Sequence, residues 1–106
     1  MFARSLTFHL KPNCSGEFTR LIENETLPAL RKYKGFQDEL TFIDPGGKDG
    51  FAVSLWDKKE YADAYNRDGY PAVLKAFGKV IDGTPQVHTY EVSNSTFHKI
   101  AAHVMA

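Results

Sequence analysis

The sequence is poor in cysteine, has no long apolar run and carries no surplus of charge. Its one cysteine, Cys14, has no second cysteine in the 106 residues to pair with, so we expect a reducing, cytoplasmic location. Thirteen basic and thirteen acidic side chains cancel, which argues against a nucleic-acid partner, because binding nucleic acid needs an excess of Lys and Arg. No stretch approaches the roughly 20 apolar residues that cross a membrane, and the first residues lack the pattern of a signal peptide, so we expect no membrane partner.

Spaced ligand motifs for metal ions and phosphates are also missing. His98 and His103 are five residues apart, whereas a metal site on a helix prefers two histidines four apart. The Gly46-Gly47 pair lies between two strand patterns, outside the strand–loop–helix unit that holds a phosphate. We therefore expect no metal and no bound cofactor.

Aromatic residues, in contrast, are plentiful. The chain has eight Phe, five Tyr and one Trp, and so small a domain has little interior in which to bury them. They must fill a core, line a pocket or cover an interface.

Alternation of apolar and polar residues predicts four strands. The first covers 2–10 and ends at a Lys-Pro-Asn turn. Residues 36–44 and 51–56 alternate in the same way, and the Gly- and Asp-rich segment between them predicts a hairpin. The fourth strand is predicted over 86–93.

Helical spacing predicts two helical regions and a terminal arm. The first region covers 15–34, and Pro28 inside it predicts a kink because proline cannot donate the usual backbone hydrogen bond. The second covers 57–80, with a break at residues 68–69. Residues 94–106 again show helical spacing, so we expect a helical arm there.

The resulting order, β-α-β-β-α-β, predicts a ferredoxin-like α+β domain over residues 1–93. Right-handed crossovers place the strands in spatial order 4-1-3-2 with both helices on one face. The other sheet face is then bare and rich in apolar residues, which soluble monomers rarely tolerate. We therefore expect a homodimer that covers it.

Strand parity suggests a site. We expect strands 1 and 3 to be parallel neighbours. If no bulge intervenes, His9, Trp56 and His88 then share one face at one end of the sheet, and Glu39 joins them. This face carries a mixture of polar, small and aromatic side chains, and it is predicted to line a cavity under the helices. The opposite, Phe-rich face is predicted to form the dimer interface. Arg4 interrupts the apolar side of the first strand; it is expected to reach an acid across the dimer or to snorkel to solvent.

His9 or His88 would be the general base, because imidazole titrates near neutral pH. The alternative is that both are edge or interface histidines without a catalytic role. The predicted substrate-binding side chains are aromatic apart from one carboxylate: Trp56, Tyr61, Tyr65, Tyr90 and Glu39. The aromatic rings would stack on a flat ligand.

In the order and spacing of several short motifs, the sequence resembles the antibiotic biosynthesis monooxygenase superfamily of dimeric α/β barrels. The resemblance covers residues 1 to about 93. The motifs are Lys11-Pro12, Leu27-Pro28-Ala29-Leu30, Lys34-Gly35-Phe36, Ser54-Leu55-Trp56-Asp57 and Val87-His88-Thr89-Tyr90-Glu91-Val92.

The resemblance implies a cofactor-independent monooxygenase acting on a small aromatic or quinone-like compound. The alternative is a non-catalytic ligand-binding or stress-related dimer, because this scaffold carries many functions. Haem-degrading relatives use an Asn on the first strand and a Trp and a His on the second helix. This sequence lacks all three at those places, so haem degradation is disfavoured, and haem binding would need His9 or His88 as the axial ligand.

Overall fold

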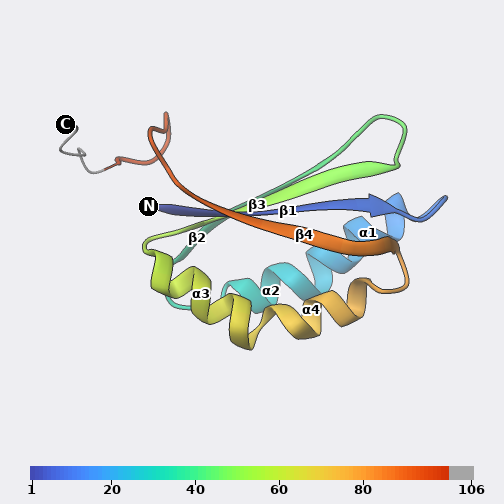
Figure 1. Ribbon diagram of the computed structural model, residues 1–106, viewed down its shortest axis with the longest axis horizontal. Helices are drawn as coiled ribbons and strands as arrows, with labels where there is room; N and C mark the ends of the chain where they lie inside the picture. The colour runs from blue at the N-terminus through green and yellow to red at the C-terminus, as the bar shows by residue number, and fades with distance from the viewer. Residues whose placement is uncertain (101–106) are drawn as a thin grey trace.

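The computed structural model describes residues 1–100, and its helices all cover one face of a four-stranded sheet (Figure 1). The strands are β1 (Phe2–Leu10), β2 (Phe36–Ile43), β3 (Asp49–Trp56) and β4 (Ile81–Glu91). The helices are α1 (Ser15–Leu21), the π-helix η1 (Ile22–Thr26), α2 (Leu27–Leu30), α3 (Lys59–Asp68) and α4 (Tyr70–Phe77). No helix within residues 1–100 is long and apolar enough to span a bilayer.

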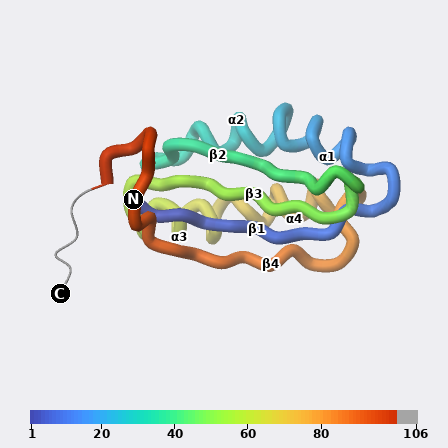
Figure 2. The backbone as a smooth tube through the Cα atoms, turned by 90° about the horizontal axis from the view of Figure 1, so that it is seen from above, coloured from blue at the N-terminus to red at the C-terminus, as the bar shows by residue number. Residues whose placement is uncertain are grey.

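The strand order is β2-β3-β1-β4, which confirms the predicted ferredoxin-like arrangement (Figure 2). The prediction that strands 1 and 3 run parallel is wrong, because β1 pairs with β3 in antiparallel register. The crossover through the first helix makes β1 parallel to β2, and the hairpin then turns β3 back between them. All three neighbouring pairs are therefore antiparallel.

The first helical run is distorted where proline predicts a kink. Pro28 has no N–H to donate to the carbonyl of Asn24, and the preceding turn is the π-helix η1. The run ends at Leu30, earlier than predicted, and turns lead to Gly35 at φ +81°. A side chain at Gly35 would overlap the ring of Tyr61, so this glycine lets the chain pass close to α3.

The second helical region matches the prediction, with α3 and α4 separated at Gly69. β4 begins at Ile81, five residues earlier than predicted. Its ladder with β1 shifts register between Thr7 and His9. This bulge, on an edge strand, accommodates Pro85.

Residues 92–100 cross the end of the sheet from β4 toward β2 (Figure 2). The Ser95 hydroxyl accepts hydrogen bonds from the backbone N–H groups of Phe97 and His98, and the His98 ring contacts Asp38 on β2. The predicted helix is not formed over 94–100. The rest of the predicted arm, 101–106, lies outside the described residues.

The core lies between the sheet and the helices. The rings of Phe8, Phe18 and Phe77 pack in a row at tilted angles, with successive centroids 4.6 and 5.1 Å apart. At the other end, Trp56 packs between Phe36 and Tyr65. Burial of these large rings stabilises the docking of the helices on the sheet.

Candidate functional site

The structure separates His9, Trp56 and His88, the three residues predicted to meet at one end of the sheet. Trp56 stands opposite Phe2, whereas His9 stands opposite Asp49 at the far end of the same strand pair. His88 stands opposite Ser5, near the middle of β1. The prediction that they share one end of the sheet is therefore wrong, because β3 runs antiparallel to β1.

The faces also differ from the prediction. Residues opposite each other in an antiparallel pair share a face, so Trp56 lies with Phe2 on the helix-covered face. His9 and His88 lie with Ser5 on the other face, which we call the open face. His9 contacts the carboxylate of Asp49 there, and both side chains are exposed. The three residues therefore do not share one face: the two imidazoles lie on one side of the sheet and the indole lies on the other.

The predicted substrate-binding residues divide in the same way. Tyr90 is on the open face and 56% exposed. Tyr61 packs against Gly35, and the Lys34 ammonium lies 5.4 Å from its ring centroid. Only Tyr65 and Glu39 line the cavity between the sheet and the helices.

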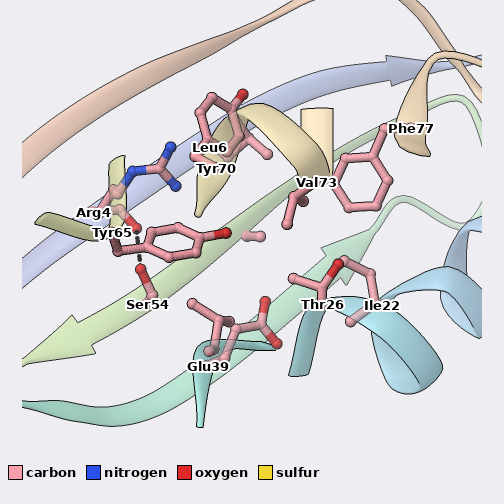
Figure 3. A pocket seen from close by; sticks show the side chains of 12 residues that line it. Arg4, Leu6, Ile22, Thr26, Glu39, Ser54, Tyr65, Tyr70, Val73 and Phe77 are labelled. Carbon is pink, nitrogen blue, oxygen red and sulfur yellow. Dashed lines mark hydrogen bonds between the residues drawn. The ribbon is translucent and has the colours of Figure 1, made fainter. Parts of the chain in front are cut away.

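That cavity is small and combines polar groups with apolar walls (Figure 3). It measures about 30 Å³, enough for one or two water molecules. Its polar lining consists of Arg4, Thr26, Glu39, Ser54, Tyr65 and Tyr70. β1, β2 and β3 supply the floor of the cavity, and η1, α2, α3 and α4 supply its walls.

Arg4 is the cation of this cavity. It is only 5% exposed, and its guanidinium carbon lies 4.2 Å from the ring centroid of Tyr70 and 5.2 Å from that of Tyr65. Nε and Nη2 both donate to Oδ1 of Asn66, at 3.3 and 3.0 Å. Burial lowers the pKa of Arg4, because the charged form is desolvated. Arg4 therefore neither snorkels nor points away from its own helices, contrary to the expectation.

Glu39 is the acid of the cavity. Its side chain is partly buried, and burial raises the pKa of its carboxyl. A hydrogen bond of 2.5 Å from the Thr41 hydroxyl opposes that rise. Glu39 also lines an outer groove between β2 and the first helical run, so it stands between the inner cavity and the surface.

Trp56 supports the cavity from behind. Its Nε1–H donates to Oγ of Ser54 at 2.9 Å, and that hydroxyl donates to the backbone carbonyl of Arg4 at 3.4 Å. The indole stacks on Tyr65 with centroids 5.5 Å apart. Burial raises the pKa of Tyr65 to about 12, so its hydroxyl stays protonated at neutral pH and is available as a donor.

Sequence reasoning missed Arg4, Ser54 and Tyr70 as members of the site. The available signal was Arg4 itself, a lone charge among Phe2, Leu6 and Phe8 on one side of the first strand. Chemically, the cavity offers a buried cation, neutral phenol donors and a carboxyl group whose pKa is raised. Apolar walls with a few polar groups are typical of small-molecule sites, and a carboxyl group with a raised pKa can accept a proton from a hydroxyl group.

Comparison with solved structures shows which proteins share this fold. A protein of unknown function from Nitrosomonas europaea aligns with a TM-score of 0.74 at 14% identity, over 96% of this chain and 95% of that one. The ActVA-Orf6 monooxygenase of Streptomyces coelicolor, solved with nanaomycin D, gives 0.76 at 14%, over 92% of each chain. The cofactor-independent oxygenase SnoaB of Streptomyces nogalater gives 0.72 at 11%, over 92% of this chain and 97% of that one.

No family model matches the sequence, and no curated protein matches it either. At identities this low, structural likeness establishes the fold and leaves the chemistry to be argued from the site. Proteins described as putative antibiotic biosynthesis monooxygenases share this fold as well, so the structure confirms the fold that the sequence resemblance predicts.

Proposed function

We propose that the protein is a cofactor-independent oxygenase of a small, electron-rich phenol or quinol, and that the reaction takes place at the cavity between Arg4 and Glu39. The observation that carries this proposal is the pairing of functions in one cavity. Glu39 has a raised carboxyl pKa, and buried Arg4 has no carboxylate within ion-pair distance among residues 1–100. The fold shared with two oxygenases is consistent with this chemistry.

Glu39 acts as the general base. A base is most effective when its pKa lies near the working pH, and burial moves the pKa of Glu39 upward in that direction. The proton of a ring hydroxyl passes to the Glu39 carboxylate, and the resulting anion is stabilised by the positive charge of Arg4. The Tyr65 hydroxyl, neutral at this pH, donates a hydrogen bond to the substrate oxygen.

Deprotonation makes the ring electron-rich enough to react with O₂. With a hydroquinone as substrate, one oxygen atom enters the ring and the other leaves as water, so a hydroquinone and O₂ give a hydroxyquinone and water. The substrate supplies all four electrons that O₂ accepts. No external reductant is therefore required.

The ring is bound partly outside the inner cavity. An inner space of about 30 Å³ holds a small polar group but not a ring. The outer groove, about 230 Å³, is lined by Thr19, Leu27 and Thr41 among others, and it shares Ile22 and Glu39 with the inner cavity. A ring that lies along this groove brings a hydroxyl group beside Glu39.

The test is oxygen incorporation from ¹⁸O₂ into methylhydroquinone, with catalase present and a protein-free blank subtracted. We expect one ¹⁸O atom in the hydroxyquinone formed by the wild-type protein. We expect a large loss of product with Glu39→Gln and none with the exposed control Glu60→Gln. Oxygen uptake that forms only unlabelled quinone, or no uptake above the blank, overturns the proposal.

The small inner cavity favours a second candidate, a ligand-binding protein without chemistry. In that case the same phenols bind and protect the protein against thermal unfolding, but the rate of oxygen uptake stays at that of the blank. The rate of oxygen uptake, measured on one preparation of the protein, therefore distinguishes the two candidates.

We further propose that the protein works as a homodimer through its open face. That face exposes Leu40, Phe42 and Phe51 on the β2–β3 hairpin, and the rings of Phe42 and Phe51 stack with centroids 4.6 Å apart. A solvated sheet face normally carries polar residues. A second copy of the same apolar patch, brought face to face, removes these side chains from water.

A further inference from the structure

The strongest feature that the proposed reaction does not fully explain is the incomplete pairing of Arg4. Nε and Nη2 share one acceptor, Oδ1 of Asn66. No carboxylate among residues 1–100 forms an ion pair with Arg4, although this residue is only 5% exposed and lines the cavity. The faces of Tyr65 and Tyr70 compensate part of the charge. A buried guanidinium that lacks an anionic partner is costly unless another group completes it.

From this geometry we infer that the ligand carries a carboxylate that binds Arg4, so that the substrate class is a hydroxylated aromatic acid. This inference rests on the proposed function, because it assigns the ligand of the same cavity. The carboxylate occupies the inner space beside the Arg4 guanidinium, and the ring extends past Glu39 into the outer groove.

Size and charge favour a carboxylate over a phosphate. The inner space of about 30 Å³ matches a small planar group, and guanidinium and carboxylate are both flat and form parallel hydrogen bonds. Arg4 is the one Lys or Arg side chain among the residues that line this cavity. A phosphate ester, with close to two negative charges, would leave much of its charge unpaired there.

The charge on Glu39 determines the orientation in which the ligand binds. A carboxylate placed beside Glu39 would meet a like charge in a partly desolvated setting, whereas a hydroxyl there donates to the Glu39 carboxylate. The charge on Glu39 and the charge on Arg4 do not neutralise each other, since no ion pair joins them within residues 1–100. The acid group therefore faces Arg4 and the hydroxyl faces Glu39, which is the orientation that the proposed proton transfer needs.

The experiment compares 2,5-dihydroxybenzoate with its methyl ester in anaerobic calorimetric titrations near pH 7. The two ligands differ in one negative charge at one position. We expect wild-type protein to bind the acid at least tenfold more tightly than the ester. Arg4→Met is expected to abolish this preference, because methionine fills buried space without charge. Arg4→Lys keeps the charge but loses the planar fork, so it retains part of the preference.

Arg67→Met is the matched control. Arg67 is an exposed arginine on α3, paired with Asp68, and its loss should leave the preference for the acid unchanged. Thermal unfolding of each variant checks that it is folded, and the wild-type comparison of acid and ester needs no variant. Equal binding of acid and ester by the wild-type protein, or no binding of either, overturns the inference.

The outcome is distinguishable from a failure of the proposed function. Tight anaerobic binding of the acid, with no ¹⁸O incorporated into any quinol, keeps the carboxylate site and refutes the oxygenase. Oxygenation of the neutral methylhydroquinone, with no preference for the acid, keeps the oxygenase and refutes the carboxylate site.

Discussion

Phe2 and Trp56 stand opposite each other in the antiparallel β1–β3 pair, and this pairing determines which side chains meet beneath the helices. It places Trp56 on the covered face, two residues along β3 from Ser54. Ser54 in turn stands between Arg4 on β1 and Glu39 on β2. The candidate site is therefore a row across three strands, with the indole behind it.

The hydrogen bond between Trp56 and Ser54 gives the first prediction. Ser54→Ala leaves the buried indole N–H without its acceptor, so we expect a loss of about 1–3 kcal/mol in the free energy of unfolding. Urea unfolding followed by circular dichroism measures it. In a Trp56→Phe background, which has no N–H to satisfy, the same substitution should cost clearly less. An equal cost in both backgrounds would show that this bond contributes little.

The raised carboxyl pKa of Glu39 predicts a pH dependence of stability. Since burial lifts the pKa above its ordinary value of 4.5, the folded protein binds this proton more tightly than the unfolded chain does. The free energy of unfolding should then fall as the pH rises from about 4.5 through the folded pKa. Glu39→Gln should remove that part of the decline, and Glu60→Gln should not. A decline that is identical in all three proteins would contradict the assignment.

Two glycines in left-handed conformations provide a matched pair. Gly35 and Gly83 have φ of +81° and +78°, so alanine at either costs about 1–2 kcal/mol of backbone strain. A Cβ at Gly35 also overlaps the ring of Tyr61, whereas a Cβ at Gly83 has no atom within 4 Å. Thermal unfolding should therefore show a larger destabilisation for Gly35→Ala than for Gly83→Ala. The reverse order would mean that Tyr61 moves away freely.

The open face predicts a change of oligomeric state. Phe42→Asp places a charge in the exposed apolar patch of the hairpin, and we expect it to convert a dimer into a monomer. Light scattering after size exclusion gives the mass directly. Val87→Asp is the control, because Val87 is also exposed but stands opposite Leu6 on the covered face. A wild-type mass of one chain would refute the dimer.

Much of the fold could be predicted from the sequence, because its signals are local. Period-two alternation located β1, β2 and β3 to within a few residues, and Pro28 marked the distorted turn of the first helix. The start of β4 was missed because Gly83 and Pro85, residues typical of turns, lie inside an edge strand at a bulge.

The site was harder to predict because it depends on how strands face one another. The alternation of side chains shows which residues of one strand share a face. It does not show which face of the neighbouring strand lies on the same side of the sheet. One wrong strand direction placed His9 with Trp56 and overlooked Arg4 with Ser54. The burial of a charged residue such as Arg4 is also settled by its neighbours, Tyr65, Tyr70 and Asn66, which come from distant parts of the chain.

The central claim is that the chemistry belongs to the covered cavity and not to the histidines of the open face. The most direct test compares initial rates of oxygen uptake with methylhydroquinone in Glu39→Gln and in the His9→Ala/His88→Ala double variant. Loss of a general base typically costs about 100-fold or more in rate. We predict a loss of that order for Glu39→Gln and an unchanged rate for the double variant. A rate that survives in Glu39→Gln and collapses without the two histidines would contradict this account.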